Sequence, residues 1–159
     1  MAGEPRAYRP DRLLVRTGGG QVDGKAMARA RMDTWNSRDR DGYAALYTDD
    51  SQVSAPGFTG KGRQGALDLL SVYVTAFPDF RIVPRTVMGD ASAGVEECVF
   101  EGTHTGPLRS ADGPEAAPTG RQVSIGFAGI HSVRSGKILS SRYYFDQLDL
   151  LTQLGVLPT

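Results

Sequence analysis

The sequence predicts an α+β fold, with three N-terminal helices packed on a curved, mostly antiparallel sheet and a short C-terminal helix. Before Pro78, apolar residues recur at the spacing of helix faces. After Pro78, extended stretches alternate with tight turns, as in an antiparallel meander. Helices followed by consecutive antiparallel strands are typical of α+β domains.

The first helix is expected to begin at Asp23, a favourable N-cap residue, and to end near Ser37. Its predicted buried stripe contains Met27, Ala30, Thr34 and Trp35.

Asp39 is expected to cap a second helix that includes Tyr43 and Tyr47, with a short extended piece at residues 52–54. Residues 55–60 are rich in turn formers. A third helix is predicted over Arg63–Ala76, because Leu69 and Tyr73 belong to a stripe of helical period and Pro78 stops it.

Four extended stretches follow, and they are predicted to pair as neighbours. A loop rich in Pro, Gly and Ala (residues 107–120) separates the second from the third, and the tight turn Arg134–Gly136 separates the last two. The terminal helix is expected over Gln147–Leu154, closed by Gly155. The four stretches are Phe80–Met88, Gly94–Thr105, Arg121–Val133 and Lys137–Asp146.

Composition limits the classes of function. The formal net charge of the 159 residues is zero, which argues against a general nucleic-acid partner. Cys98 is the only cysteine, so an internal disulfide is excluded. No apolar run approaches the roughly 20 residues of a membrane span, and the N-terminus lacks the apolar core of a signal peptide. We therefore expect a cytoplasmic protein without a membrane partner.

Residues 1–22 differ from the rest of the chain, with four arginines, two prolines and the run Gly18–Gly20. This composition predicts a mobile basic N-terminal tail, followed by one domain over residues 23–159. Two interpretations of the tail stay open: disorder without a function, or a basic arm that docks on a partner or closes over a pocket.

The last predicted strand places Arg142, Tyr144 and Asp146 at every second position. Alternate side chains of a strand share one face, so a guanidinium, a phenol and a carboxylate would lie side by side. That combination suggests the lining of a small-molecule pocket.

Several segments, in this order, make the chain resemble the SnoaL-like polyketide cyclases of the NTF2-like superfamily. They are Trp35–Asp39, Ala76–Phe80, Gly102–Leu108, Ala117–Arg121, Gly136–Ile138, Tyr144–Asp146 and Gln153–Gly155. The resemblance covers residues 23–158. It implies an NTF2-like cone with a deep hydrophobic pocket, and a homo-oligomer, either a dimer or a tetramer.

The resemblance also implies a reaction. Family cyclases close the last ring of an aromatic polyketide by an intramolecular aldol condensation, with an aspartate as acid/base, a histidine to help it, and no metal or cofactor. The expected partner is a small polycyclic aromatic or polyketide substrate. Alternatives are a polyketide hydroxylase or an epoxide-opening enzyme on the same scaffold, or a module that only binds a ligand or a protein.

Asp146 is the first candidate for the acid/base. A carboxylate that faces apolar walls would have a raised pKa and could take and return a proton near neutral pH. An N-cap for the helix that begins at Gln147 is the competing interpretation. Arg142 and Tyr144 would bind a substrate oxygen, although Arg142 could instead hold Asp146 in a salt bridge.

His131 is the second catalytic candidate, on the neighbouring strand, opposite Tyr143 or Arg142; a register slip of one residue would turn it outward. His104 could contact substrate, but a hydrogen bond that holds the Thr105–Leu108 loop is the favoured interpretation. Trp35, Asn36 and Phe127 are further substrate-binding candidates at the predicted pocket wall. The spacing of the histidines and the lone cysteine give no metal or cofactor signature.

Overall fold

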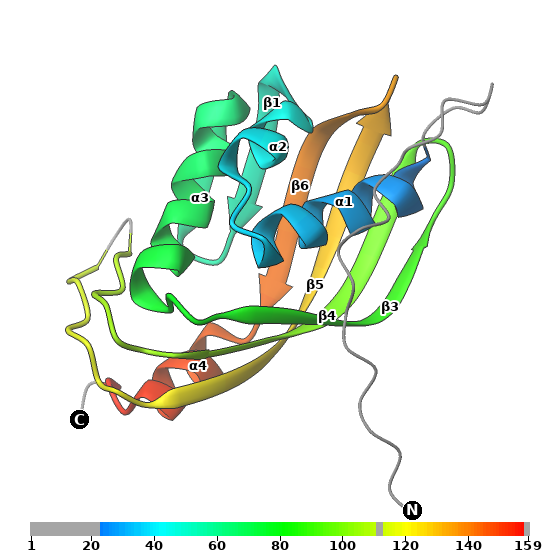
Figure 1. The fold of residues 1–159 in the computed structure, drawn as a ribbon. Coiled ribbons are helices and arrows are strands. Elements are labelled where there is room, and N and C mark those ends of the chain that lie inside the picture. Colours follow the sequence, from blue (N-terminus) through cyan, green and yellow to red (C-terminus); the bar gives the residue numbers. More distant parts are fainter. Residues whose placement is uncertain (1–22, 111–112, 158–159) are drawn as a thin grey trace, which may run out of the picture.

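The structure, a computed structural model, describes residues 23–110 and 113–157. The predicted basic tail, residues 1–22, lies outside the described residues. The architecture is α+β: three helices cover one face of a curved six-stranded sheet, and a fourth lies at one end of it (Figure 1). This confirms the predicted fold class.

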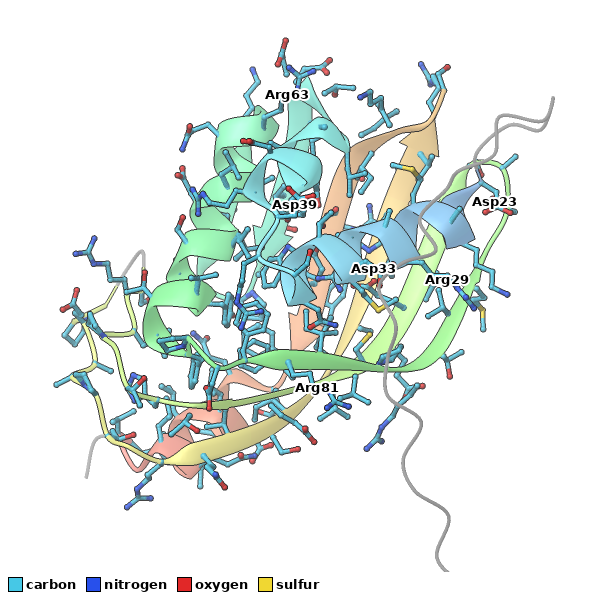
Figure 2. The ribbon with its side chains drawn as sticks, in the orientation of Figure 1. Asp23, Arg29, Asp33, Asp39, Arg63 and Arg81 are labelled. Carbon is cyan, nitrogen blue, oxygen red and sulfur yellow. The ribbon has the colours of Figure 1, made fainter. Side chains whose placement is uncertain are left out.

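The first two helices begin where aspartate side chains cap them. α1 (Gly24–Asn36) and α2 (Arg40–Ala45) follow Asp23 and Asp39, whose carboxylates accept hydrogen bonds from Ala26 N and Gly42 N at 2.9 Å each. Figure 2 shows both aspartates at the helix starts. α3 spans Gly62–Ala76, and α4 spans Gln147–Leu154 and ends at Gly155, which has a left-handed backbone with φ 69°. All four predicted helices are present.

The strand order in the sheet is β2-β1-β6-β5-β4-β3. β1 runs parallel to β6, and all other neighbouring pairs are antiparallel. The four strands predicted after Pro78 are therefore consecutive neighbours. The bounds are β1 Tyr47–Ala55, β2 Phe58–Lys61, β3 Arg81–Gly89, β4 Ala93–Thr103, β5 Gln122–Arg134 and β6 Lys137–Phe145.

β1 is longer than the short extended piece predicted, and β2 was not predicted. Tyr47 begins β1 rather than ending α2, and β2 occupies part of the segment expected to be only a turn. The middle of β1 is polar, so its sequence carries little alternation, and its place comes from pairing with β2 and with the distant β6.

The core fills the space between the helices and the inner face of the sheet and is rich in aromatic rings. Trp35 of α1 packs edge-on against Tyr43 with ring centroids 5.7 Å apart, and Phe80 stacks on Phe100 at 5.2 Å. Asn36 fastens the end of α1 to β3, because its amide donates to Ile82 O at 2.9 Å and accepts from Ile82 N at 2.8 Å. α1 is thus fixed at the residue next to Trp35.

The buried stripe of α1 is displaced from the predicted one. Ala30 and Thr34 are only partly buried, whereas Arg31 is buried together with Met27 and Trp35. An arginine therefore faces the core.

Among the residues that the structure describes, no helix combines the length and the apolar character needed to cross a membrane.

Candidate active site

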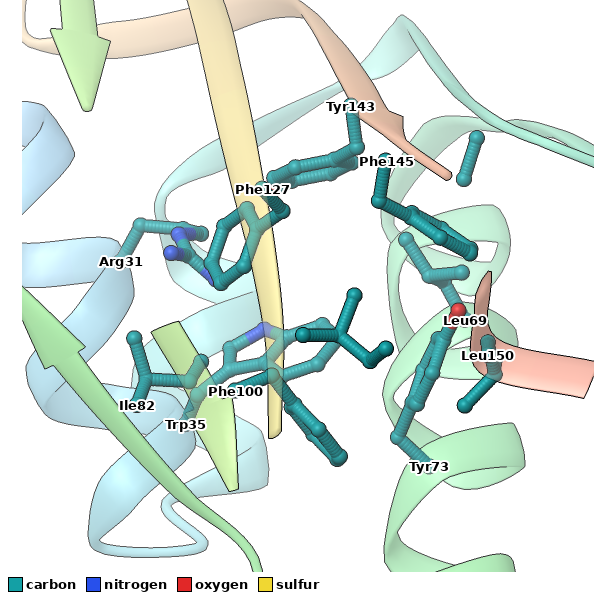
Figure 3. Close-up of a pocket in the computed structure, with 12 residues that line it drawn as sticks. Arg31, Trp35, Leu69, Tyr73, Ile82, Phe100, Phe127, Tyr143, Phe145 and Leu150 are labelled. Atoms are coloured by element: carbon teal, nitrogen blue, oxygen red, sulfur yellow. The ribbon is translucent and has the colours of Figure 1, made fainter. Parts of the chain in front are cut away.

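A cavity of about 50 Å³ lies between α1, α3, the start of α4 and the inner face of the sheet (Figure 3). We call it the inner chamber. Most of its lining residues are buried, and nearly all are apolar or aromatic. They are Arg31, Trp35, Ala55, Leu69, Tyr73, Ile82, Phe100, Ile125, Phe127, Tyr143, Phe145 and Leu150.

Arg31 is the one charged residue of this lining, and its side chain is 1% exposed. The Arg31 Cζ lies 5.3 Å from the ring centroid of Trp35, 5.4 Å from that of Tyr143 and 5.7 Å from that of Phe127. These distances place the guanidinium among three π faces, which attract cations. Figure 3 shows Arg31 reaching from α1 toward Phe127.

A buried carboxylate balances this charge. Glu96, on the inner face of β4, accepts a hydrogen bond from Arg31 Nη2 and is fully buried. Burial alone would raise the pKa of Glu96, but the charge of Arg31 and the nearby His131 outweigh it and hold the pKa below the ordinary range. Burial alone would lower the pKa of Arg31, and Glu96 reverses that shift. Both side chains therefore stay ionised.

His131 stands on the other side of Glu96. Its Nε2 lies 3.6 Å from Glu96 Oε1, and its side chain is fully buried. Glu96 is thus flanked by a guanidinium and an imidazole.

A chain of hydroxyl groups holds the other ring nitrogen of His131. Nδ1 lies 2.8 Å from Ser141 Oγ, which lies 2.9 Å from Tyr47 OH, which in turn lies 3.2 Å from Tyr43 OH. Burial raises the pKa of both tyrosines, so the hydroxyls keep their protons. Each hydroxyl can donate or accept. Nδ1 can therefore accept from Ser141 in a neutral ring that carries its proton on Nε2, and it donates to Ser141 in the other neutral tautomer and in a protonated ring.

Two atoms of the ion pair have no hydrogen-bond partner among the described residues, Arg31 Nε and Glu96 Oε2. Buried polar atoms normally have partners, so these two mark a place where a ligand's polar group could bind.

Three predicted site residues lie on the outer face of β6, away from the inner chamber. Arg142, Tyr144 and Asp146 do share a face, but it is the outer face, and all three are exposed. Ser141, Tyr143 and Phe145 point inward instead. Asp146 caps α4 by accepting a hydrogen bond from Asp149 N at 3.0 Å. The prediction that its carboxylate faces an enclosed pocket is wrong, and the N-cap interpretation is confirmed.

Other predicted residues divide into two groups. Trp35 and Phe127 line the inner chamber, and His131 lies inward, opposite Ser141 rather than Tyr143 or Arg142. His131, His104 and Asn36 are not among its lining residues. His104 Nδ1 accepts a hydrogen bond from Thr119 N at 3.2 Å, so its role is structural as expected, but it holds the end of the connection between β4 and β5 rather than residues 105–108.

Arg31 and Glu96 were missed as site residues. A signal was present for each: Arg31 lies one helical turn after Met27 and one before Trp35, and Glu96 shares a strand face with Cys98 and Phe100. Opposite charges at two core positions indicate a buried pair.

In residues 23–110 and 113–157, no group of three or more His, Cys, Asp or Glu side chains is arranged to hold a metal ion.

Solved structures of known proteins share this fold. AclR from Streptomyces galilaeus, a candidate hydroxylase, superposes with a TM-score of 0.71 at 21% identity, over 88% of this chain and 89% of its own. A candidate SnoaL-like polyketide cyclase from Jannaschia sp. CCS1 gives 0.73 at 19% identity, over 89% and 99%. IdmH from Streptomyces antibioticus, a candidate polyketide cyclase, gives 0.65 at 23% identity, over 82% and 96%.

The cone-shaped NTF2-like fold that the sequence predicts is thus shared with these proteins. No curated protein matches the sequence. The family model described as SnoaL-like polyketide cyclase matches residues 25–154, which is most of the chain. The protein therefore belongs to the SnoaL-like polyketide cyclase family.

Proposed function

We propose that this protein is a cofactor-free polyketide cyclase that closes a ring of an aromatic polyketide by an intramolecular aldol reaction. The observation that carries the proposal is the buried cluster of Arg31, Glu96 and His131, of which Arg31 lines an aromatic chamber and the other two lie behind it. Family membership supports the substrate class.

The chamber walls suit a flat aromatic ligand. Trp35, Phe100 and Phe127 offer ring faces and edges to a polycycle. A carbonyl oxygen at the Arg31 end would accept a hydrogen bond from the unpartnered Nε. Burial keeps the Tyr143 hydroxyl protonated by raising its pKa well above the ordinary value, so Tyr143 can also donate. Donors fixed in a dry site stabilise the enolate that forms when the carbon next to the carbonyl loses a proton.

His131 replaces Asp146 as the acid/base in this proposal. The substrate's acidic C–H bond breaks, and the proton passes to Nε2 of a neutral ring whose Nδ1–H donates to Ser141 Oγ. The carbanion attacks a side-chain carbonyl, a C–C bond forms, and His131 returns the proton to the new alkoxide. Glu96 stabilises the imidazolium between the two transfers. Folding the substrate so that the two carbons meet accounts for much of the acceleration.

Two matched substitutions test the assignment, with a tricyclic aromatic β-keto ester that carries a side-chain ketone as substrate. His131→Asn should lower kcat by about 10²–10⁴-fold, because general acid–base catalysis is lost. Asp146→Asn should leave kcat unchanged, because asparagine also caps helices. Steady-state kinetics with mass spectrometry of the product measure both.

The outcomes separate the candidates. Aldol closure keeps the mass of the substrate or removes water. Full activity in His131→Asn would contradict the role of His131. If His131 is the acid/base, the pH–rate profile of the variant should lose one limb. Because the fold is shared with AclR, a candidate hydroxylase, hydroxylation is the second candidate, and a product that gains one oxygen atom would favour it.

A further inference from the structure

A second cavity, of about 270 Å³, lies beside the inner chamber, and we call it the outer pocket. Its walls are the turn between β1 and β2, one side of α3, the start of α4 and the loop after β4. Gly57, Arg109 and Gln147 at its rim are exposed, so it opens to solvent. Deeper in, it is lined by apolar residues such as Phe58, Val72 and Leu108.

The two cavities share four lining residues, namely Leu69 and Tyr73 of α3, Phe145 at the end of β6 and Leu150 of α4. We call these four the partition. Figure 3 shows them together at the edge of the inner chamber nearest α3 and α4. Tyr73 and Phe145 are only partly buried. A thin layer of side chains, rather than backbone, therefore separates the inner chamber from the outer pocket.

Size decides what the inner chamber can hold. Pockets for drug-sized ligands measure roughly 300–1,000 Å³, far more than the 50 Å³ of the inner chamber. The outer pocket adds 270 Å³, and the two volumes together reach the lower end of that range. A ligand of three fused rings therefore fits only if it occupies both cavities.

We propose that the outer pocket is a second subsite, which binds the part of a polycyclic ligand that is remote from Arg31 after the partition side chains turn aside. This inference rests on the proposed function for the reacting end of the ligand. The remote part has to be neutral and largely apolar. Arg109, the charged residue of the lining, is already paired with Glu115, with Nε 2.9 Å from Oε2.

The chemistry of the ligand follows from the two ends. The reacting end carries a carbonyl or enolate oxygen for the Arg31 guanidinium. The far end carries fused rings without a charge, because its walls are Phe58, Val72 and Leu108. A carboxylate at the far end would lose its hydration there without gaining an unpaired cation.

The test measures binding separately from turnover. Trp35 is the only tryptophan of the sequence and lines the inner chamber, so its fluorescence reports ligand there. The probes are 1-hydroxyanthraquinone, with three rings, and 4-hydroxyacetophenone, with one. Titration calorimetry gives the affinities independently of the light that the probes absorb.

Val72→Phe fills the outer pocket without touching the inner chamber, since Val72 lines only the former. It should raise the Kd of the three-ring probe at least tenfold and leave that of the one-ring probe unchanged. Gln64→Phe, at an exposed position of the same helix, is the control and should change neither. Leu108→Phe, on the opposite wall, should repeat the effect if Val72→Phe does not fold.

An unchanged Kd of the three-ring probe in a folded Val72→Phe or Leu108→Phe protein would overturn the inference. So would a wild-type protein that binds the one-ring probe but not the three-ring probe. The proposed function fails by a different result: a wild-type protein that binds both probes, shows the Val72→Phe effect and does not cyclise the β-keto ester.

Discussion

Arg31 occupies a position on α1 where a large apolar residue would normally lie, one turn from Met27 and one turn from Trp35. Its guanidinium is buried, and Glu96 on the facing strand supplies the opposite charge. A buried pair of this kind gains little net stability over apolar residues, but loss of one partner leaves a bare charge in the core. The pair therefore adds little to the free energy of folding, and a role in binding would explain its presence.

At this scale we predict that Glu96→Gln destabilises the fold by about 3–5 kcal/mol, because the charge of Arg31 stays buried without its partner. Glu97→Gln is the matched control, one residue further along β4 and exposed, and should change stability by less than about 0.5 kcal/mol. Urea denaturation followed by circular dichroism measures both. Equal effects of the two substitutions would show that Arg31 does not depend on Glu96.

The same pair predicts a dependence of stability on pH. The pKa of Glu96 is lower in the folded protein than in the unfolded chain. Its contribution is therefore fully present above the unfolded pKa, about 4.3, and is lost as the pH falls through the folded value. Wild-type stability should fall below about pH 4.3 more steeply than that of Glu96→Gln. Urea midpoints between pH 7 and pH 3 measure the difference, and parallel curves would contradict it.

At the scale of elements, the start of α1 rests directly on the hairpin of β3 and β4. Gly24 N donates to Asp90 O at 2.7 Å, and a Cβ on Gly24 would come within 1.9 Å of Ala93 O. Only glycine permits this close approach. The contact positions the whole helix, and with it Arg31 and Trp35.

Gly24→Ala should therefore destabilise the protein by about 1–3 kcal/mol, because backbone has to move apart to admit the methyl group. Gly126→Ala on β5 is the control, since a Cβ there meets no atom within 4 Å, and it should be neutral or slightly stabilising. Thermal melts compare the two. A Gly24→Ala protein as stable as the control would show that α1 can shift freely on the hairpin.

Elements whose signals are local could be predicted from the sequence. The terminal helix has the predicted bounds, because Asp146 and Gly155 cap it from adjacent positions. β1 was largely missed, since its polar middle becomes a strand only by pairing with β2 and β6. Local caps act within a few residues, whereas sheet membership depends on partners far along the chain.

The candidate site was harder to predict, because the two faces of β6 are alike. Tyr143 and Phe145 point inward, while Arg142, Tyr144 and Asp146 point outward, and both sets contain aromatic rings. Alternation shows which side chains share a face, but the side that faces the core depends on how the sheet curves around the helices. His131 was chosen because the chain has only two histidines, both on predicted pocket strands, and the structure resolves the open question of its side by burying it.

At the scale of the whole molecule, the helical layer and the curved sheet enclose the inner chamber, and α4 closes one end near the outer pocket. Neither cavity can be read from a sequence, because volumes depend on how side chains from many elements meet. We expect a dimer or a tetramer, as for the family, and light scattering after size-exclusion chromatography measures the mass.

The cluster around Glu96 joins parts of the chain that are remote in sequence. Arg31 and Glu96 are 65 residues apart, and Tyr47 and Ser141 are 94 apart. Contacts over such separations form late, after the entropy of long loops has been lost. Catalytic activity should thus be among the last properties that a newly made chain acquires. A chain released before its final strand is complete would have no activity.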